Sequence, residues 1–202
     1  NISMIEFICI IAFLIAFIAV FHDYKQPYIV FSFLLLLVIF LEGTKWEMGV
    51  DWRSYFNFFE VASNWQEQKT RGGLAFEPGF RLYAFTIANL TENYSVFIFI
   101  TMAFCYSAIL IPIFRMTNKS FVSIFYLLTI IPWYSGALRQ MIAIGFFTLS
   151  LNAIHNRNFW KFFFYILVGF LFHITAILYL PMYFIYNLSW GLFVILYVGA
   201  VF

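Results

Sequence analysis

Charged residues are scarce in this sequence. Asp, Glu, Lys and Arg make up 10% of its 202 residues, whereas a soluble domain carries about 25%. Hydrophobic residues make up 64% and aromatic residues 24%, which is more apolar surface than a folded chain of this size can bury. The composition therefore excludes an ordinary soluble domain and predicts a protein whose helices lie in lipid.

Cysteines are few, and the motifs of common cofactors are missing. The two cysteines, Cys9 and Cys105, both lie in apolar runs, which favours small buried residues over a disulfide or a metal pair. The sequence has no His, Cys and Asp cluster with metal-ligand spacing, no P-loop and no Gly-x-Ser-x-Gly motif. A net charge of +2 without a basic stripe argues against a nucleic-acid partner. We therefore expect neither a cofactor nor a metal.

Long apolar runs are what the chain has in abundance. They cover residues 3–21, 28–42, 94–114, 120–135, 137–154, 159–180 and 190–202. None of them alternates like a barrel strand, and each is long enough to favour a helix. The pattern predicts an all-α, polytopic transmembrane helix bundle with about six full spans and a truncated seventh. Residues 1–202 would then be a single integral membrane domain, the N-terminal part of a longer chain.

Short basic loops predict how this bundle is oriented. They cover residues 22–26, 115–120 and 155–161. Loops rich in Lys and Arg stay on the cytoplasmic side, so segment 43–93 is expected on the outer face, together with the hairpin around Gly136 and the turn after Pro181. Because the other loops are short, we expect function to reside in 43–93.

The outer loop 43–93 is predicted to carry two amphipathic surface helices. Aromatic residues recur at helical spacing in the first of them: Trp52, Tyr55, Phe56 and Phe59. That spacing forms one aromatic face, which we expect to rest on the membrane. The second helix begins at Pro78, which suits a first helical position. At about 14 residues it is too short to span a bilayer.

Asp51 precedes the first surface helix and has two interpretations. It either caps the helix that follows or presents a carboxylate to a substrate hydroxyl or a sugar at the membrane surface. The two interpretations are compatible.

Arg139, in "YSGALRQMIAIG", is predicted in the first turn of a helix that begins at Ala137 and is capped by Ser135 and Gly136. A cation there opposes the helix macrodipole at a cost of about 0.3–1 kcal/mol. An anion bound at the same place would satisfy backbone N–H groups and the guanidinium together. Arg139 therefore either holds a phosphate-type ligand, with Gln140 adding hydrogen bonds, or extends to lipid headgroup phosphates.

His173 lies inside the apolar run 159–180. If that run is one helix, counting from Trp160 at about 1.5 Å per residue places His173 about 20 Å across a core of about 30 Å, on the side of Arg139. A histidine there either bonds to a neighbouring helix or marks a site, where a neutral imidazole acts as a base or a hydrogen-bond donor.

Further charged residues share the predicted outer face: Glu42, Lys45, Glu47, Arg53, Glu77 and Arg81. They form either a solvated rim of weak ion pairs or, for Lys45 and Arg53, contacts to a second phosphate. Aromatic residues are either interface anchors or platforms that stack on sugars, with Trp52 and Tyr55 as candidates for substrate binding. The residues alone therefore indicate a membrane protein that holds an anionic, lipid-linked substrate on its outer face.

Four stretches follow one another along the chain: "EGTKWEMGVDWRSYFNFF" (42–59), "EPGFRLY" (77–83), "LRQMIAIGFFTLSLNAI" (138–154) and "FWKFFFYILVGFLFHITAILYLP" (159–181). Their order and spacing are similar to those of the EpsG family, the Wzy-type polymerases of bacterial surface polysaccharides. The sequence resembles this family over about residues 28–187. By position, the resemblance matches Asp51, Glu77, Arg139 and His173 to the family's motif residues.

The resemblance implies an integral glycosyltransferase of the bacterial cytoplasmic (inner) membrane, with its active site facing outward. Its donor would be a growing glycan on undecaprenyl pyrophosphate, and its acceptor a repeat unit on a second such carrier. Partners would be a flippase of the same pathway and a chain-length regulator. The main alternatives are a transporter or flippase for lipid-linked oligosaccharides, a glycan ligase, and a non-catalytic scaffold subunit.

The resemblance also suggests roles for the candidate residues. Arg139 would take up charge on the leaving pyrophosphate, helped by Lys45 or Arg53. Lysine stands at 45 where the family often has arginine, which weakens a bidentate phosphate contact there. A base must help to deprotonate the acceptor hydroxyl. Asp51 and His173 compete for that role, with Glu77 behind them.

Overall fold

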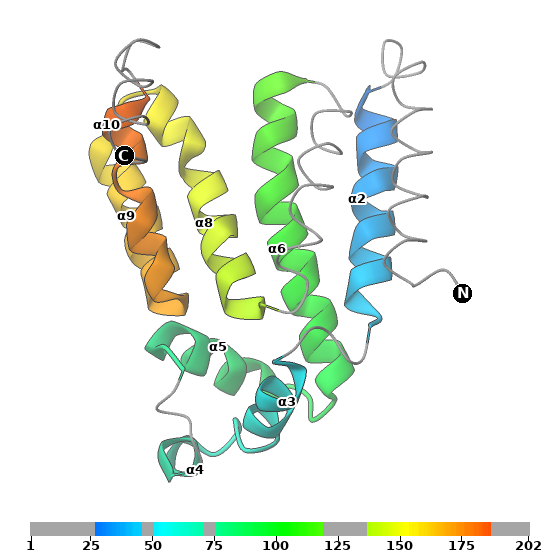
Figure 1. Cartoon of the computed structure of the whole chain (residues 1–202). Coiled ribbons are helices and arrows are strands. Elements are labelled where there is room, and N and C mark those ends of the chain that lie inside the picture. The colour runs from blue at the N-terminus through cyan, green and yellow to red at the C-terminus, as the bar shows by residue number, and fades with distance from the viewer. Residues whose placement is uncertain (1–26, 46–50, 71–75, 119–136, 187–202) are drawn as a thin grey trace, which may run out of the picture.

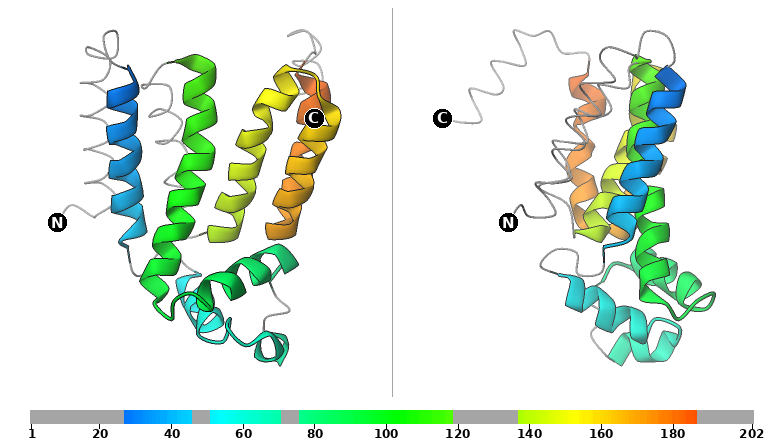
Figure 2. Two further views of the ribbon diagram at one scale, coloured as in Figure 1. Left: turned by 180° about the vertical axis from the view of Figure 1, so that it is seen from behind. Right: turned by 90° about the vertical axis from the view of Figure 1, so that its right-hand side faces the viewer.

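The structure is a computed structural model that describes residues 27–45, 51–70, 76–118 and 137–186, and every helix or strand assigned within these ranges is a helix. Four helices run side by side (Figure 1): α2 (Pro27–Gly43), α6 (Tyr94–Thr117), α8 (Leu138–His155) and α9 (Phe159–Phe172). Three further helices lie across one end of this bundle (Figure 2): α3 (Trp52–Glu60), α4 (Trp65–Thr70) and α5 (Pro78–Ala88). We call this end the α5 end. The all-α prediction is confirmed for the described residues.

Within the described ranges, α6 is the helix whose length and composition suit a membrane span. The helix α2, the helix α9 and the segment Ile174–Ile185 are apolar but shorter. The predicted runs 28–42, 94–114 and 137–154 coincide with α2, α6 and α8 to within a few residues. The runs 3–21, 120–135 and 190–202 lie outside the described residues, so the number of spans stays a prediction.

The contact between α6 and α8 is close because small residues face each other. A Cβ placed on Gly145 of α8 would lie 3.1 Å from the Cβ of Ala108 on α6. Pro112 lacks the N–H that would bond to the Ala108 carbonyl four residues earlier. The hydroxyl of Thr148 on α8 lies 3.1 Å from that carbonyl oxygen, and it also lies 2.9 Å and 3.0 Å from the Ile144 and Gly145 carbonyl oxygens of its own helix, which compete for its one proton. Thr148 is therefore the polar group of α8 that lies beside the carbonyl deprived of its helical donor by Pro112.

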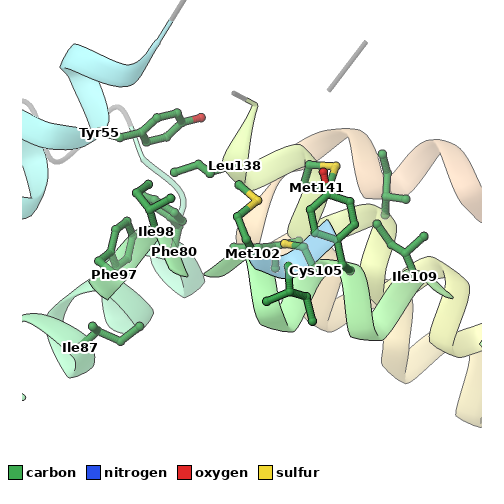
Figure 3. Packing of buried hydrophobic residues seen from close by; sticks show 14 of the residues in the cluster. Tyr55, Phe80, Ile87, Phe97, Ile98, Met102, Cys105, Ile109, Leu138 and Met141 are labelled. Carbon is green, nitrogen blue, oxygen red and sulfur yellow. The ribbon is translucent and has the colours of Figure 1, made fainter. Parts of the chain in front are cut away.

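Aromatic side chains join the α5 end to the bundle. Tyr55, Phe58 and Phe59 of α3 are buried, with Phe58 against Phe80 of α5 and Phe59 against Phe97 of α6. These residues belong to one buried cluster that continues along α6 and α8, part of which is drawn in Figure 3. On the aromatic face of α3, which we expected to rest on the membrane, Tyr55 and Phe59 are thus covered by protein, and Trp52 and Phe56 are half-buried.

The predicted single helix over 159–180 is wrong. Helix α9 ends at Phe172, and His173 has an extended backbone with φ −158° and ψ 130°. A 3₁₀ helix, η2 (Ile174–Tyr179), follows and packs against α9 and α8. His173 therefore lies not partway along a span but in a turn at the α5 end, where the chain reverses.

The turn after Pro181 also differs from its prediction. Helix α10 (Met182–Ile185) returns to the end of the bundle opposite the α5 end (Figure 1). There Arg157 donates from Nη1 to the Tyr183 carbonyl over 2.9 Å, and the Tyr183 ring packs against Phe159. We predicted this turn on the same side as segment 43–93, but it lies beside the loop 155–161, which we assigned to the other side.

Candidate active site

A carboxylate just before α5 joins two residues that are distant from it in sequence. Glu77, the residue before α5, accepts a hydrogen bond of 2.6 Å at Oε2 from Nη1 of Arg139 on α8. Its Oε1 lies 2.9 Å from Nδ1 of His173, and it accepts a longer contact of 3.4 Å from the backbone N–H of Ile174. The three charged or polar side chains are each about one-fifth exposed, at 19% to 21%, so they are held by protein and remain reachable from solvent.

Aromatic residues fix the guanidinium of Arg139. The Tyr55 phenol lies close enough to Arg139 for each group to act on the pKa of the other. Burial raises the pKa of Tyr55 above its usual value despite the opposing effect of the Arg139 cation, so the phenol stays neutral. Arg139 Cζ also lies 4.8 Å from the centre of the Phe76 ring, a cation–π contact. Arg139 is thereby oriented by α3 and by the residues before α5.

Glycine at position 79 permits the approach that forms this cluster. A Cβ there would lie 2.7 Å from the Leu171 carbonyl oxygen at the end of α9. Backbone atoms cannot give way to such a contact as a flexible side chain would. The first turn of α5 therefore packs directly on the end of α9, which brings Glu77 to the His173 turn.

The ionisation state of Glu77 determines which nitrogen of His173 carries the proton. Burial raises the pKa of Glu77, but the hydrogen bonds from His173 and Arg139 outweigh burial and hold that pKa below its ordinary value of 4.5. An ionised carboxylate only accepts hydrogen bonds, so Nδ1 of His173 must donate to Oε1. In the neutral imidazole the lone pair then lies on Nε2. The cluster therefore presents a base at one atom, Nε2, and a cation at Arg139.

A depressed pKa of Glu77 also predicts how stability depends on pH. The folded carboxyl binds its proton more weakly than the unfolded one. Its contribution to the free energy of unfolding is therefore present above pH 4.5 and is lost as the pH falls through the lower pKa of the folded protein. Thermal unfolding of the detergent-solubilised wild type should therefore lose midpoint temperature more steeply below this pH than the Glu77→Gln variant does. The matched control is Glu60→Gln, at an exposed residue of α3, which should follow the wild type. Parallel curves for wild type and Glu77→Gln would contradict the expectation.

Other candidates on α3 lie near this cluster without bonding to it. Asp51 occupies the N-cap position of α3, but its side chain makes no capping hydrogen bond and is exposed. Its charge contributes to the raised pKa of Tyr55. Trp52 is half-buried, and the exposed Arg53 lies over its ring, with Cζ 5.4 Å from the ring centre. Gln140 is half-buried on α8 beside Arg139.

Lys45 forms an ion pair with Glu42, a buried carboxylate that we predicted on a solvated rim. Its Nζ lies 2.5 Å from Oε1 of Glu42, whose side chain is fully buried. Buried charges need partners, and this pair lies at the end of α2. The Lys45 side chain is 12% exposed, so its first role is to neutralise Glu42. Composition alone gave no sign of this pairing, although the i, i+3 spacing of the two residues would have allowed it.

Known proteins were compared with this chain in three ways. Curated proteins and solved structures gave no match. A family model, however, matches residues 28–202, a range that includes Glu77, Arg139 and His173. The chain therefore belongs to the EpsG family, whose members are associated with membranes and with the polymerisation of polysaccharides.

Proposed function

We propose that this protein is a membrane glycosyltransferase that polymerises oligosaccharide repeat units carried on undecaprenyl pyrophosphate. One observation carries the proposal: Glu77 holds an arginine 62 positions away and a histidine 96 positions away in a single partly exposed cluster. A transfer from a diphosphate leaving group to a hydroxyl requires a cation and a base close together. The cluster supplies both.

His173 is the proposed base, and Glu77 is its positioning residue. The acceptor sugar hydroxyl attacks the anomeric carbon of the donor, and its proton passes to Nε2 of His173. A new C–O bond forms as the bond between the anomeric carbon and the pyrophosphate oxygen breaks, so undecaprenyl pyrophosphate leaves with the electron pair. The Glu77 carboxylate stabilises the imidazolium, as the carboxylate does in other carboxylate–histidine pairs.

Two carboxylates remain as alternatives for the base. The pKa of Glu77 is held below its ordinary value, so this carboxylate is too weakly basic to remove a hydroxyl proton efficiently near neutral pH. The Asp51 side chain is exposed, and no hydrogen bond or ion pair joins it to the described part of the cluster. Of the three candidates, His173 is the one whose proton acceptor, Nε2, is oriented by a partner, because Nδ1 is bonded to Glu77.

Arg139 is proposed to stabilise the leaving diphosphate. In the structure a carboxylate, Glu77, provides the anion that we expected from a phosphate at this helix start. A diphosphate that binds here takes the place of Glu77 as the anion beside Arg139. The Glu77 carboxylate then keeps its hydrogen bond to His173. The start of α8, where Arg139 lies in the first turn, also presents backbone N–H groups to an anion.

An apolar pocket next to the His173 turn suits part of the lipid carrier. It lies between α9 and η2 and has a volume of about 180 Å³, and its described lining residues, such as Phe170 and Ile177, are apolar. Phe170 is three residues from His173. We propose that isoprene units of the carrier occupy this pocket while its diphosphate lies at Arg139.

Reconstitution of the full-length protein tests the proposed function. Liposomes would contain the protein and a repeat unit linked to undecaprenyl pyrophosphate, and the products would be separated by length. A ladder of chain lengths is expected. A single added unit would indicate a ligase, and transbilayer movement without a new linkage would indicate a flippase; either result would overturn the proposal.

A further inference from the structure

A second pocket lies at the end of the bundle opposite the Glu77 cluster. It has a volume of about 480 Å³ and lies where the last turns of α6 and α8 meet the beginning of α9. Three of its lining residues carry basic side chains: Arg115, His155 and Lys161. Apolar surface from Pro112 and Leu149 lines the same pocket. The pocket therefore combines basic groups with an apolar wall.

The basic groups in this pocket have no described acidic partner. All described carboxylates belong to residues 42–92, at or next to the α5 end. Within the described ranges, neither the Arg115 side chain nor the Lys161 side chain makes an ion pair or hydrogen bond. His155 differs, because its Nδ1 lies 3.0 Å from the Tyr186 hydroxyl. Among the described residues, Arg115 and Lys161 thus face one cavity without an acidic partner.

Helix ends explain some of these basic residues but not Lys161. Arg115 is in the last turn of α6 and His155 is in the last turn of α8, where a cation favours the helix macrodipole. Lys161, by contrast, lies in the first turn of α9, and its backbone N–H donates to the capping side chain of Asn158 over 3.0 Å. A cation at that position opposes the macrodipole unless an anion lies beside it.

We infer that this pocket binds a phosphate group, with the phosphate between Arg115 and Lys161. The apolar wall and the adjacent Tyr165 fit the start of an acyl chain, so an anionic phospholipid and a free phosphate are the two sources of this chemistry. The site is separate from the Glu77 cluster and does not depend on the proposed polymerase reaction.

Binding measurements on the full-length protein in a non-ionic detergent test this inference. Native mass spectrometry would measure bound phosphatidylglycerol, with phosphatidylcholine as the zwitterionic comparison, and thermal unfolding would measure the response to inorganic phosphate. The Arg115→Gln/Lys161→Gln double variant is expected to bind phosphatidylglycerol about thirtyfold more weakly, from the usual contribution of two cations near a phosphate. The single variant Lys161→Gln, which replaces the charge of an exposed side chain by a neutral amide, is used if the double variant fails to fold.

The control for the single variant removes one cation from the α5 end, in the variant Arg81→Gln, and should bind phosphatidylglycerol like the wild type. A response to inorganic phosphate that the pocket variants lose, without a further gain from lipid, would support the phosphate site and identify a free anion as its source. Equal lipid and phosphate binding by the wild type and the pocket variants would overturn the inference.

Discussion

The Arg139→Ala variant is expected to make glycan product about 10²–10³-fold more slowly than the wild type. That range is typical when one group that stabilises developing charge is removed. Loss of the guanidinium removes the cation at the proposed diphosphate position and also breaks the contacts with Glu77 and Tyr55. Initial rates of chain extension in liposomes, at saturating donor and acceptor, measure the effect on kcat.

Two further variants separate charge from structure in that measurement. Arg139→Lys keeps the charge but loses the planar fork, so it should retain more activity than the alanine variant. Arg81→Ala removes an arginine that contacts Gln68 and Trp65 instead of Glu77, and it should extend chains at nearly the wild-type rate. An Arg139→Ala variant that extends chains normally would eliminate the proposed diphosphate contact. If both alanine variants lose activity together, the cause is general damage to the α5 end.

Local signals in the sequence were sufficient to predict most helices but not their contacts. Pro78 marks the start of α5 and Arg139 lies in the first turn of α8, both as predicted. The break at His173 could not be predicted in this way, because no glycine or proline stands at the break itself and the nearest glycine, Gly169, lies within α9. The extended residue is stabilised by a tertiary partner, since the Glu77 carboxylate accepts from both His173 and the Ile174 N–H.

The candidate site was predicted as a set of residues but not as an arrangement. Resemblance to a family selected Asp51, Glu77, Arg139 and His173. The structure joins the last three by hydrogen bonds, whereas Asp51 is exposed and not bonded to them. The resemblance could not show that Glu77 would provide the anion at Arg139, because an ion pair across 62 positions leaves no periodic pattern in the sequence. The same limit applies to α3, whose aromatic face looks alike in sequence whether lipid or protein covers it.

The His173→Ala variant is expected to reduce chain extension by about 10²–10⁴-fold, the usual contribution of a general base. The variant should still reach the membrane, because His173 is partly exposed and its backbone bonds do not require the ring. A purely structural histidine would give a loss that no small molecule repairs. If Nε2 accepts the proton, added imidazole should restore part of the rate, and methylimidazoles should restore it in the order of their basicity. Loss of activity without such rescue would contradict the role of base.

Double-mutant cycles show whether Glu77 acts on the reaction mainly through Arg139 or mainly through His173. It contacts both Arg139 and His173, so Glu77→Gln alone removes a charge that serves two groups. If its main effect is to orient and stabilise the His173 imidazole, then Glu77→Gln should slow the wild type but add little to the loss already present in His173→Ala, because residues that act as a unit are not additive. Combined with Arg139→Lys, the same substitution should multiply the losses. The reverse pattern would make Glu77 a partner of the cation and leave His173 without a positioning residue.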